Sequence, residues 1–136
     1  MNEYFERPDG LGPVSGYSHA VAGTGRLVAV SGQLPVDADG NVVDPTDSLV
    51  QARQVFANLT HALAAAGAQP KDVIKLTFYL TDINDLHAIR AARDEFVGDG
   101  PPPASSLVQV SALVLPEVRL EIDALAITPA RRKKSH

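Results

Sequence analysis

The sequence contains no cysteine and no tryptophan, and it has only one methionine among its 136 residues. Without cysteine the chain has no disulfide framework, no thiolate metal site and no cysteine nucleophile. This composition suits a reducing compartment, so we expect a cytoplasmic protein. Long apolar runs are also missing, since none approaches the ~20 residues that span a bilayer. The N-terminal stretch MNEYFERPDG is too polar for a secretory leader, so we expect no membrane association.

Positive charge is scarce, with 12 Lys and Arg against 16 Asp and Glu and a net charge of −4. Nucleic-acid binding draws much of its affinity from neutralised phosphates, so a nucleic-acid partner is not expected. The only basic stretch is ARRKKSH at the C-terminus. We expect residues 129–136 to form a disordered, solvated tail, with a binding arm as the alternative. Residues 1–128 are long enough for one domain with its own core.

The motifs of several well-known catalytic sites are absent. The histidines are scattered without metal-ligand spacing, and they are His19, His61, His87 and His136. No serine-hydrolase elbow, phosphate-binding loop or dinucleotide fingerprint occurs. We therefore expect no metal site.

Two helices are predicted, at about residues 48–66 and 86–96. The first carries an apolar stripe with helical periodicity, which indicates one inward-packed face. The stripe consists of Leu49, Ala52, Val55, Phe56, Leu59 and Leu63. The expected caps and stops are Thr46 or Asp47 and Gly67 for the first helix, and Asn84 or Asp85 and Gly98 for the second.

Four strands are predicted, at about residues 26–31, 72–81, 106–112 and 119–127. The second alternates, with Ile74, Leu76, Phe78 and Leu80 on one face and Lys75, Thr77 and Tyr79 on the other. The order strand–helix–strand–helix–strand–strand predicts an α+β or α/β sandwich with the helices on one face. The opposite sheet face is only partly apolar. It is either solvated or packed against a neighbouring subunit, and we favour the second.

The stretch from residue 101 to 127, PPPASSLVQVSALVLPEVRLEIDALAI, combines a proline loop with two strands. Glu121 lies within the second strand, where a carboxylate is costly unless it has a partner or a function. A loop fixed by prolines beside a strand with a polar face is a plausible wall of a small-molecule pocket.

Together with GPVSGYSHAV, VAVSGQLPVDADGNVV, QARQVFANLTHALAAAG and DVIKLTFYLTDINDL, this stretch resembles the RidA (reactive intermediate deaminase) family, also called endoribonuclease L-PSP. The resemblance covers about residues 12–127. It implies a chorismate-mutase-like α+β fold whose mixed sheet has two helices packed on one face. It further implies a homotrimeric barrel with sites between subunits. Active members hydrolyse 2-imino or 2-enamino acids to 2-keto acids and ammonia without a cofactor.

The resemblance assigns roles to three residues. Tyr17 would pack on the ligand, the backbone N–H of Gly32, next to Ser31, would help to hold a carboxylate, and Glu121 would orient the attacking water. Structural alternatives remain for each. Tyr17 could be a core aromatic, Ser31 and Gly32 could only shape the backbone, and Glu121 could pair with an arginine, either Arg119 or Arg93.

The sequence departs from the family pattern at the carboxylate clamp. Ser105 stands where the family has an arginine in a Pro-Ala-Arg-Ser motif. Leu107 stands where the family has a small residue two places later, and Arg90 stands where the family has an asparagine in a helix. A neutral hydroxyl in place of a bidentate guanidinium costs roughly 2–5 kcal/mol of carboxylate binding if the partner charge is buried. This exchange argues against ordinary 2-imino acid deamination.

Another arginine could take over the clamp. On a helical wheel that starts at Leu86, Arg93 lies at about 340°, inside the apolar stripe, and Arg90 at about 40°, at its edge. An arginine on a packed face usually snorkels or meets an anion. Arg93 could therefore pair with Asp82, Asp85 or a neighbouring subunit's carboxylate, or either arginine could serve the site or lie at the surface.

Three functions follow from these residues. The first is a diverged imine or enamine deaminase acting on a small reactive metabolite, with Glu121 as the water-orienting group. The second is a trimer that binds a carbonyl or imine compound without chemistry, which the loss of arginine at Ser105 favours. The third is an endoribonuclease, as the family's other name suggests, but the acidic net charge of the chain argues against RNA binding.

Overall fold

The computed structural model describes residues 1–129, so all but the first residue of the tail expected at residues 129–136 lies outside the described residues. The α-helices and strands, in chain order, are β1 (Glu3–Phe5), β2 (Ala20–Ala22), β3 (Arg26–Gln33), α1 (Ser48–Ala65), β4 (Val73–Leu80), α2 (Leu86–Val97), β5 (Ala104–Gln109) and β6 (Leu120–Thr128). The β1–β2 pair was not predicted, because strands of three residues carry too little alternation to be recognised.

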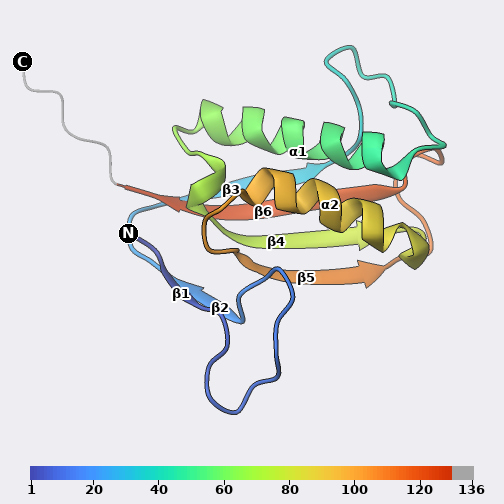
Figure 1. Cartoon of the computed structure of the whole chain (residues 1–136). Coiled ribbons are helices and arrows are strands. Elements are labelled where there is room, and N and C mark those ends of the chain that lie inside the picture. The colour runs from blue at the N-terminus through green and yellow to red at the C-terminus, as the bar shows by residue number, and fades with distance from the viewer. Residues whose placement is uncertain (130–136) are drawn as a thin grey trace, which may run out of the picture.

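The main sheet has the strand order β3–β6–β4–β5 and is mixed. Strands β4 and β5 run parallel, whereas β6 pairs antiparallel with both β3 and β4. Helices α1 and α2 lie side by side over one face, and β1 and β2 form a separate two-stranded sheet (Figure 1). The predicted α+β fold with two helices on one face is confirmed.

The ends of the helices follow their capping residues. Asp47 caps α1, since its carboxylate accepts hydrogen bonds from the backbone N–H groups of Leu49 and Val50 at 3.0 and 3.1 Å. Gly67, with φ of 78°, turns the chain after α1 as predicted. Asp85, one of the two predicted caps, is the N-cap residue of α2, although its side chain makes no capping hydrogen bond. The short 3₁₀ turn before α2 is capped by Asp82, which accepts from the Asn84 N–H.

One predicted face assignment in β4 is wrong. The register of β4 against β6 shifts between Val73 and Lys75, so Ile74 is the extra residue of a bulge. Val73 therefore faces the helices and is 2% exposed, while Ile74 is only half-buried. The alternation expected for Leu76, Phe78 and Leu80 holds beyond the bulge.

The core lies between the sheet and the two helices, where side chains of α1, α2, β3, β4 and β6 pack together. The opposite face, called here the open sheet face, is covered by no helix from residues 1–129 (Figure 1). Apolar side chains are exposed along it: Leu27 at 67%, Val108 at 45% and Leu125 at 38%. It also carries the polar residues Lys75, Thr77, Tyr79, Glu121 and Asp123.

Candidate functional site

A cavity of about 240 Å³ opens between α2, β4, β5 and the loop that precedes β2. Eight residues line it: Ser15, Tyr17, Phe78, Ile89, Arg90, Arg93, Ser105 and Leu107. Five of them, Tyr17, Arg90, Arg93, Ser105 and Leu107, were selected from the sequence. Segments more than 80 residues apart in the chain thus meet at one concave surface.

Ser18 fixes Tyr17 beside the proline loop. The backbone N–H of Ser18 donates to the Pro103 carbonyl at 3.0 Å, and its hydroxyl donates to the Pro102 carbonyl at 2.6 Å. Ser18 is 1% exposed, and it pairs with Ala104 as an isolated bridge. The start of β5, and with it Ser105, is therefore held against the Tyr17 segment. Nothing in the sequence gives Ser18 this role, because a serine within a loop motif does not reveal a partner so distant in the chain.

Arg93 lies on the packed face of α2, as the helical wheel indicated, and is 9% exposed. Its Nε and Nη2 both donate to one oxygen of Asp94, at 3.1 and 2.9 Å. The expected partners Asp82 and Asp85 are wrong for this chain, because Asp82 caps the turn before α2 and Asp85 binds Arg119. A carboxylate from a neighbouring subunit remains untested by a single chain.

Gly16 lies against the Arg93 guanidinium. A Cβ atom at Gly16 would stand 2.6 Å from Cζ and 3.1 Å from Nη1 of Arg93, and the φ of Gly16 is 76°. Only a residue without a side chain leaves this space to the guanidinium. Gly16 was not selected from the sequence, although the Ser15-Gly16-Tyr17 string was visible there.

The other cavity residues differ in exposure. Ser105 and Leu107 are partly buried, while Ser106 between them is exposed, so the pair points to the helix side of β5. Lys75 binds Ser106 on the open sheet face, at 2.9 Å between Nζ and Oγ. Arg90 is exposed and borders the cavity from α2.

Glu121 and Gly32 form a second polar site on the other side of the sheet. A Cβ at Gly32 would stand 2.6 Å from the Glu121 carboxyl carbon, so the carboxylate rests directly over the Gly32 backbone. Glu121 is half-buried, and Ser31 next to Gly32 is exposed. None of these three residues lines the cavity of Tyr17 and Ser105.

The alternative in which Glu121 pairs with an arginine is wrong within the described chain. Arg93 binds Asp94, and Arg119 binds Asp85. Among residues 1–129, Glu121 takes part in no side-chain hydrogen bond or salt bridge. Its carboxylate is therefore not engaged by the protein groups that surround it.

Tyr79 and Asp123 lie next to Glu121 on the open sheet face. The Tyr79 hydroxyl donates to Asp123 Oδ2 at 3.1 Å, and Tyr79 pairs in register with Glu121. The hydrogen bond and the negative charge of Asp123 raise the pKa of Tyr79, with burial and the charge of Glu121 adding to the shift. Two carboxylates and a neutral phenol thus occupy this part of the sheet.

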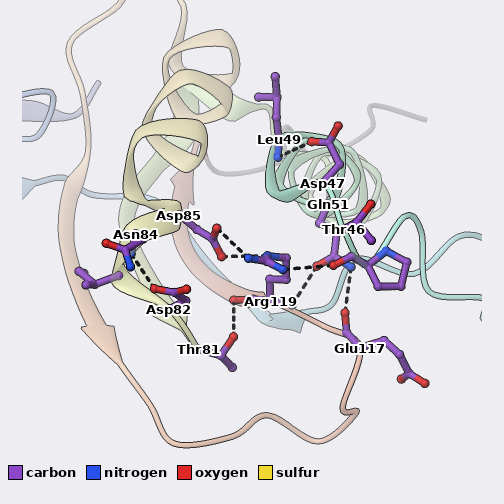
Figure 2. Close-up of polar contacts among 12 residues, drawn as sticks. Thr46, Asp47, Leu49, Gln51, Thr81, Asp82, Asn84, Asp85, Glu117 and Arg119 are labelled. Carbon is purple, nitrogen blue, oxygen red and sulfur yellow. Dashed lines mark hydrogen bonds and ion pairs between the residues drawn. The ribbon is translucent and has the colours of Figure 1, made fainter.

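Arg119 joins the start of β6 to both helices. It donates to Asp85 before α2, and its backbone N–H donates to the Gln51 side chain at 2.8 Å (Figure 2). Gln51 is fully buried and also donates to the carbonyls of Val43 and Glu117. The network fixes the strand that carries Glu121, but it does not line the cavity.

Over residues 1–129, no cluster of three or more His, Cys, Asp or Glu side chains is arranged to hold a metal ion. Neither helix of this range is long and apolar enough to cross a membrane. The polar side chains of the cavity are the hydroxyls of Ser15, Tyr17 and Ser105 and the guanidiniums of Arg90 and Arg93.

The chain is similar to several known proteins along most of its length. The family model for endoribonuclease L-PSP matches residues 8–128. Protein DfrA of Myxococcus xanthus is 36% identical over 124 residues, covering 90% of this chain and 91% of the relative. The 2-iminobutanoate/2-iminopropanoate deaminase of Escherichia coli is 34% identical over 105 residues, covering 76% and 80%. The crystal structure of YyfB from Yersinia pestis, a Rid-family protein of unknown function, matches this fold with a TM-score of 0.86. The two sequences are 37% identical, and the match covers 93% of this chain and 98% of YyfB.

Proposed function

The chain belongs to the endoribonuclease L-PSP (RidA) family, and from that membership we propose that it hydrolyses the C=N bond of a small imine, or of the imine tautomer of an enamine, to a carbonyl compound and ammonia. The observation that carries this proposal is the single cavity shared by Tyr17, Arg90, Arg93, Ser105 and Leu107. Tyr17, Arg90, Ser105 and Leu107 are positions that the family resemblance singled out, and Arg93 is the arginine that the helical wheel placed on the packed face of α2. At about 240 Å³ the cavity lies just below the roughly 300–1,000 Å³ of sites for drug-sized ligands, which suits a small metabolite.

The reaction needs a water molecule held beside the electrophilic carbon. In our proposal Glu121 accepts a hydrogen bond from that water, which adds to the C=N carbon. One water proton passes through the carboxylate to the nitrogen, and the resulting carbinolamine collapses to the carbonyl and ammonia. A carboxylate not engaged by neighbouring protein groups is suited to this role, and Glu121 has no such partner among residues 1–129.

The cavity and Glu121 come together, in our proposal, between two copies of the chain. Within one chain they lie on opposite sides of the sheet, and Gly32 and Ser31 accompany Glu121. The exposed apolar residues Leu27 and Leu125 on the open sheet face support a subunit interface there. We propose a homotrimer with three intersubunit sites. Light scattering should then give three times the 14.4 kDa chain mass.

Turnover provides the test of the chemistry. The assembled protein is incubated with enzymatically generated 2-iminobutanoate and with neutral imines, and ammonia release is followed. We expect a rate above buffer that Glu121→Gln abolishes, while Glu117→Gln, an exposed glutamate at the end of the loop before β6, leaves it unchanged. Rates equal to buffer for every imine would contradict the proposal, as would full activity of Glu121→Gln.

A non-catalytic binding protein is the second candidate, and Ser105 is the observation that favours it. A hydroxyl donates one neutral hydrogen bond where a guanidinium supplies a charged, bidentate clamp. If 2-keto acids or neutral carbonyl compounds raise the melting temperature of the protein while the matching imines are not turned over, the result would support binding alone. Turnover that appears only in Ser105→Arg would show that the site persists without its ordinary activity.

Ribonuclease activity is a minor candidate that rests on the family description alone. The cavity is lined by no histidine or carboxylate to act as a general acid or base on a phosphodiester. RNA cleavage that survives extensive purification and removal of residues 130–136 would revive it.

A further inference from the structure

We propose that Arg93, placed by Gly16, is the group that binds the substrate's carboxylate in this protein, so that the acid is held from helix α2 instead of from strand β5. The inference deepens the proposed function, because it names the specificity-determining residue of the same cavity. Four observations carry it: the charge of the cavity wall, the unpaired nitrogen of Arg93, the weakness of the ion pair with Asp94, and the fit of Gly16 around the guanidinium.

The cavity is cationic on one side only. Its two charged lining residues, Arg90 and Arg93, both come from α2, and no Asp or Glu lines it. The β5 side contributes the neutral Ser105 and Leu107. A small carboxylate entering this space is therefore attracted toward α2, and its carbon skeleton can lie against Leu107 and Phe78.

Arg93 has hydrogen-bonding capacity to spare. Its two recorded side-chain hydrogen bonds use Nε and Nη2, and Nη1 has no protein acceptor among residues 1–129. No buried side-chain nitrogen or oxygen in that range lacks a partner, so Nη1 must be accessible to solvent although the residue is 9% exposed. Arg93 lines the cavity, and in our proposal Nη1 is the nitrogen that meets an anion entering it.

Asp94 does not neutralise this charge within the cavity. The Asp94 side chain is 67% exposed, against 11% for Arg93. An ion pair with a solvated carboxylate is weak and is screened by water and salt. Asp94 does not line the cavity, so it orients the guanidinium from outside while an anion can approach from inside.

Gly16 makes the space in which the guanidinium lies. A methyl group there would overlap Arg93 Cζ at 2.6 Å and drive the guanidinium away. Gly16 stands between Ser15 and Tyr17, which both line the cavity. The loop thus frames Arg93 with two hydroxyls, both of which can donate to a carboxylate. Gly16 acts as a positioning residue.

The test compares a stable acid with its neutral counterpart. Binding of 2-oxobutanoate and of 2-oxobutanamide to the assembled protein is measured by calorimetry at low and high salt. We expect wild type to prefer the acid by at least roughly tenfold, with a preference that falls as salt rises. Arg93→Met should remove the preference by weakening acid binding far more than amide binding, and Arg93→Lys should keep part of it. Gly16→Ala should weaken acid binding with Arg93 still present.

Arg53→Met is the matched control, because Arg53 is an arginine on the neighbouring helix that pairs with Glu95 away from the cavity. An acid preference that persists in Arg93→Met, or no acid binding by wild type, would overturn the inference. If Arg93→Met does not fold, unchanged acid preference in Gly16→Ala would overturn it. The proposed hydrolysis fails separately, through absent turnover or an active Glu121→Gln, whether or not Arg93 governs acid binding.

Discussion

Arg119 and Asp85 form a bidentate ion pair, with Nε 2.9 Å from Oδ2 and Nη2 3.1 Å from Oδ1. The pair joins the residue before β6 to the turn before α2. The Asp85 hydrogen bond raises the pKa of Arg119, burial opposes this shift, and the charges of Asp85 and Asp82 add to it. The strand that carries Glu121 and the helix that carries Arg93 are therefore connected by one contact.

We predict that Arg119→Met destabilises the protein by roughly 2–3 kcal/mol, because it leaves the Asp85 carboxylate, 9% exposed, without its charged partner. The value lies below that of a fully buried pair, since 33% of the Arg119 side chain is exposed. Denaturant unfolding measures the loss. Arg53→Met is the control and should cost less than about 1 kcal/mol, because more than half of both side chains in the Arg53–Glu95 pair is exposed. Equal losses in the two variants would contradict the prediction.

Gln51 should be the most sensitive polar residue of α1. It is fully buried and binds three backbone groups, at Val43, Glu117 and Arg119. Gln51→Leu leaves those groups without a partner, and we expect a loss of roughly 3–5 kcal/mol in the free energy of unfolding. Gln54→Leu, which removes a single bond to Asn58 one turn further along, should cost about 1 kcal/mol or less. A tolerated Gln51→Leu would mean that water replaces the side chain.

Most of the fold could be predicted because its elements obey local periodicity. The stripe of α1 and the alternation of β4 from Leu76 onward required only apolar positions. The bulge at Ile74 could not be predicted, because it depends on the register of β4 against β6, which lies far along the chain. Gln51 was missed for a similar reason, since its partners come from a loop and from the start of β6.

Five of the residues that line the cavity could be selected from the sequence, but the contacts that hold them there could not. The helical wheel indicated that Arg93 faces inward, but its partner is Asp94, the adjacent residue, which a face argument does not select. Tyr17, Ser105 and Leu107 were selected through the family resemblance, and hydrogen bonds from Ser18 to the proline loop bring them together. Long-range backbone contacts of this kind leave no local pattern in the sequence.

Tyr79 should ionise at higher pH than an ordinary tyrosine. Its hydrogen bond to Asp123 and that carboxylate's charge raise its pKa, with Glu121 contributing repulsion as well. A group whose pKa is raised on folding adds stability below its unfolded pKa of about 10. This stability is lost as pH rises through the higher folded value. Ultraviolet titration of wild type minus Tyr79→Phe isolates the phenol, and Asp123→Asn should lower its midpoint. An unchanged midpoint in Asp123→Asn would contradict the assignment.

Gly32→Ala should displace the Glu121 carboxylate and reduce turnover while the fold is retained. A Cβ at Gly32 would meet the Glu121 carboxyl carbon at 2.6 Å, and the side chain can rotate away more easily than the backbone can move. We expect a loss of at least roughly tenfold in kcat, because a displaced carboxylate no longer orients water. The KM for substrate should change less, since Gly32 does not line the cavity. Gly100→Ala is the control, because a Cβ there meets nothing within 4 Å. If Gly32→Ala keeps full turnover, the position of Glu121 over Gly32 has no part in the chemistry.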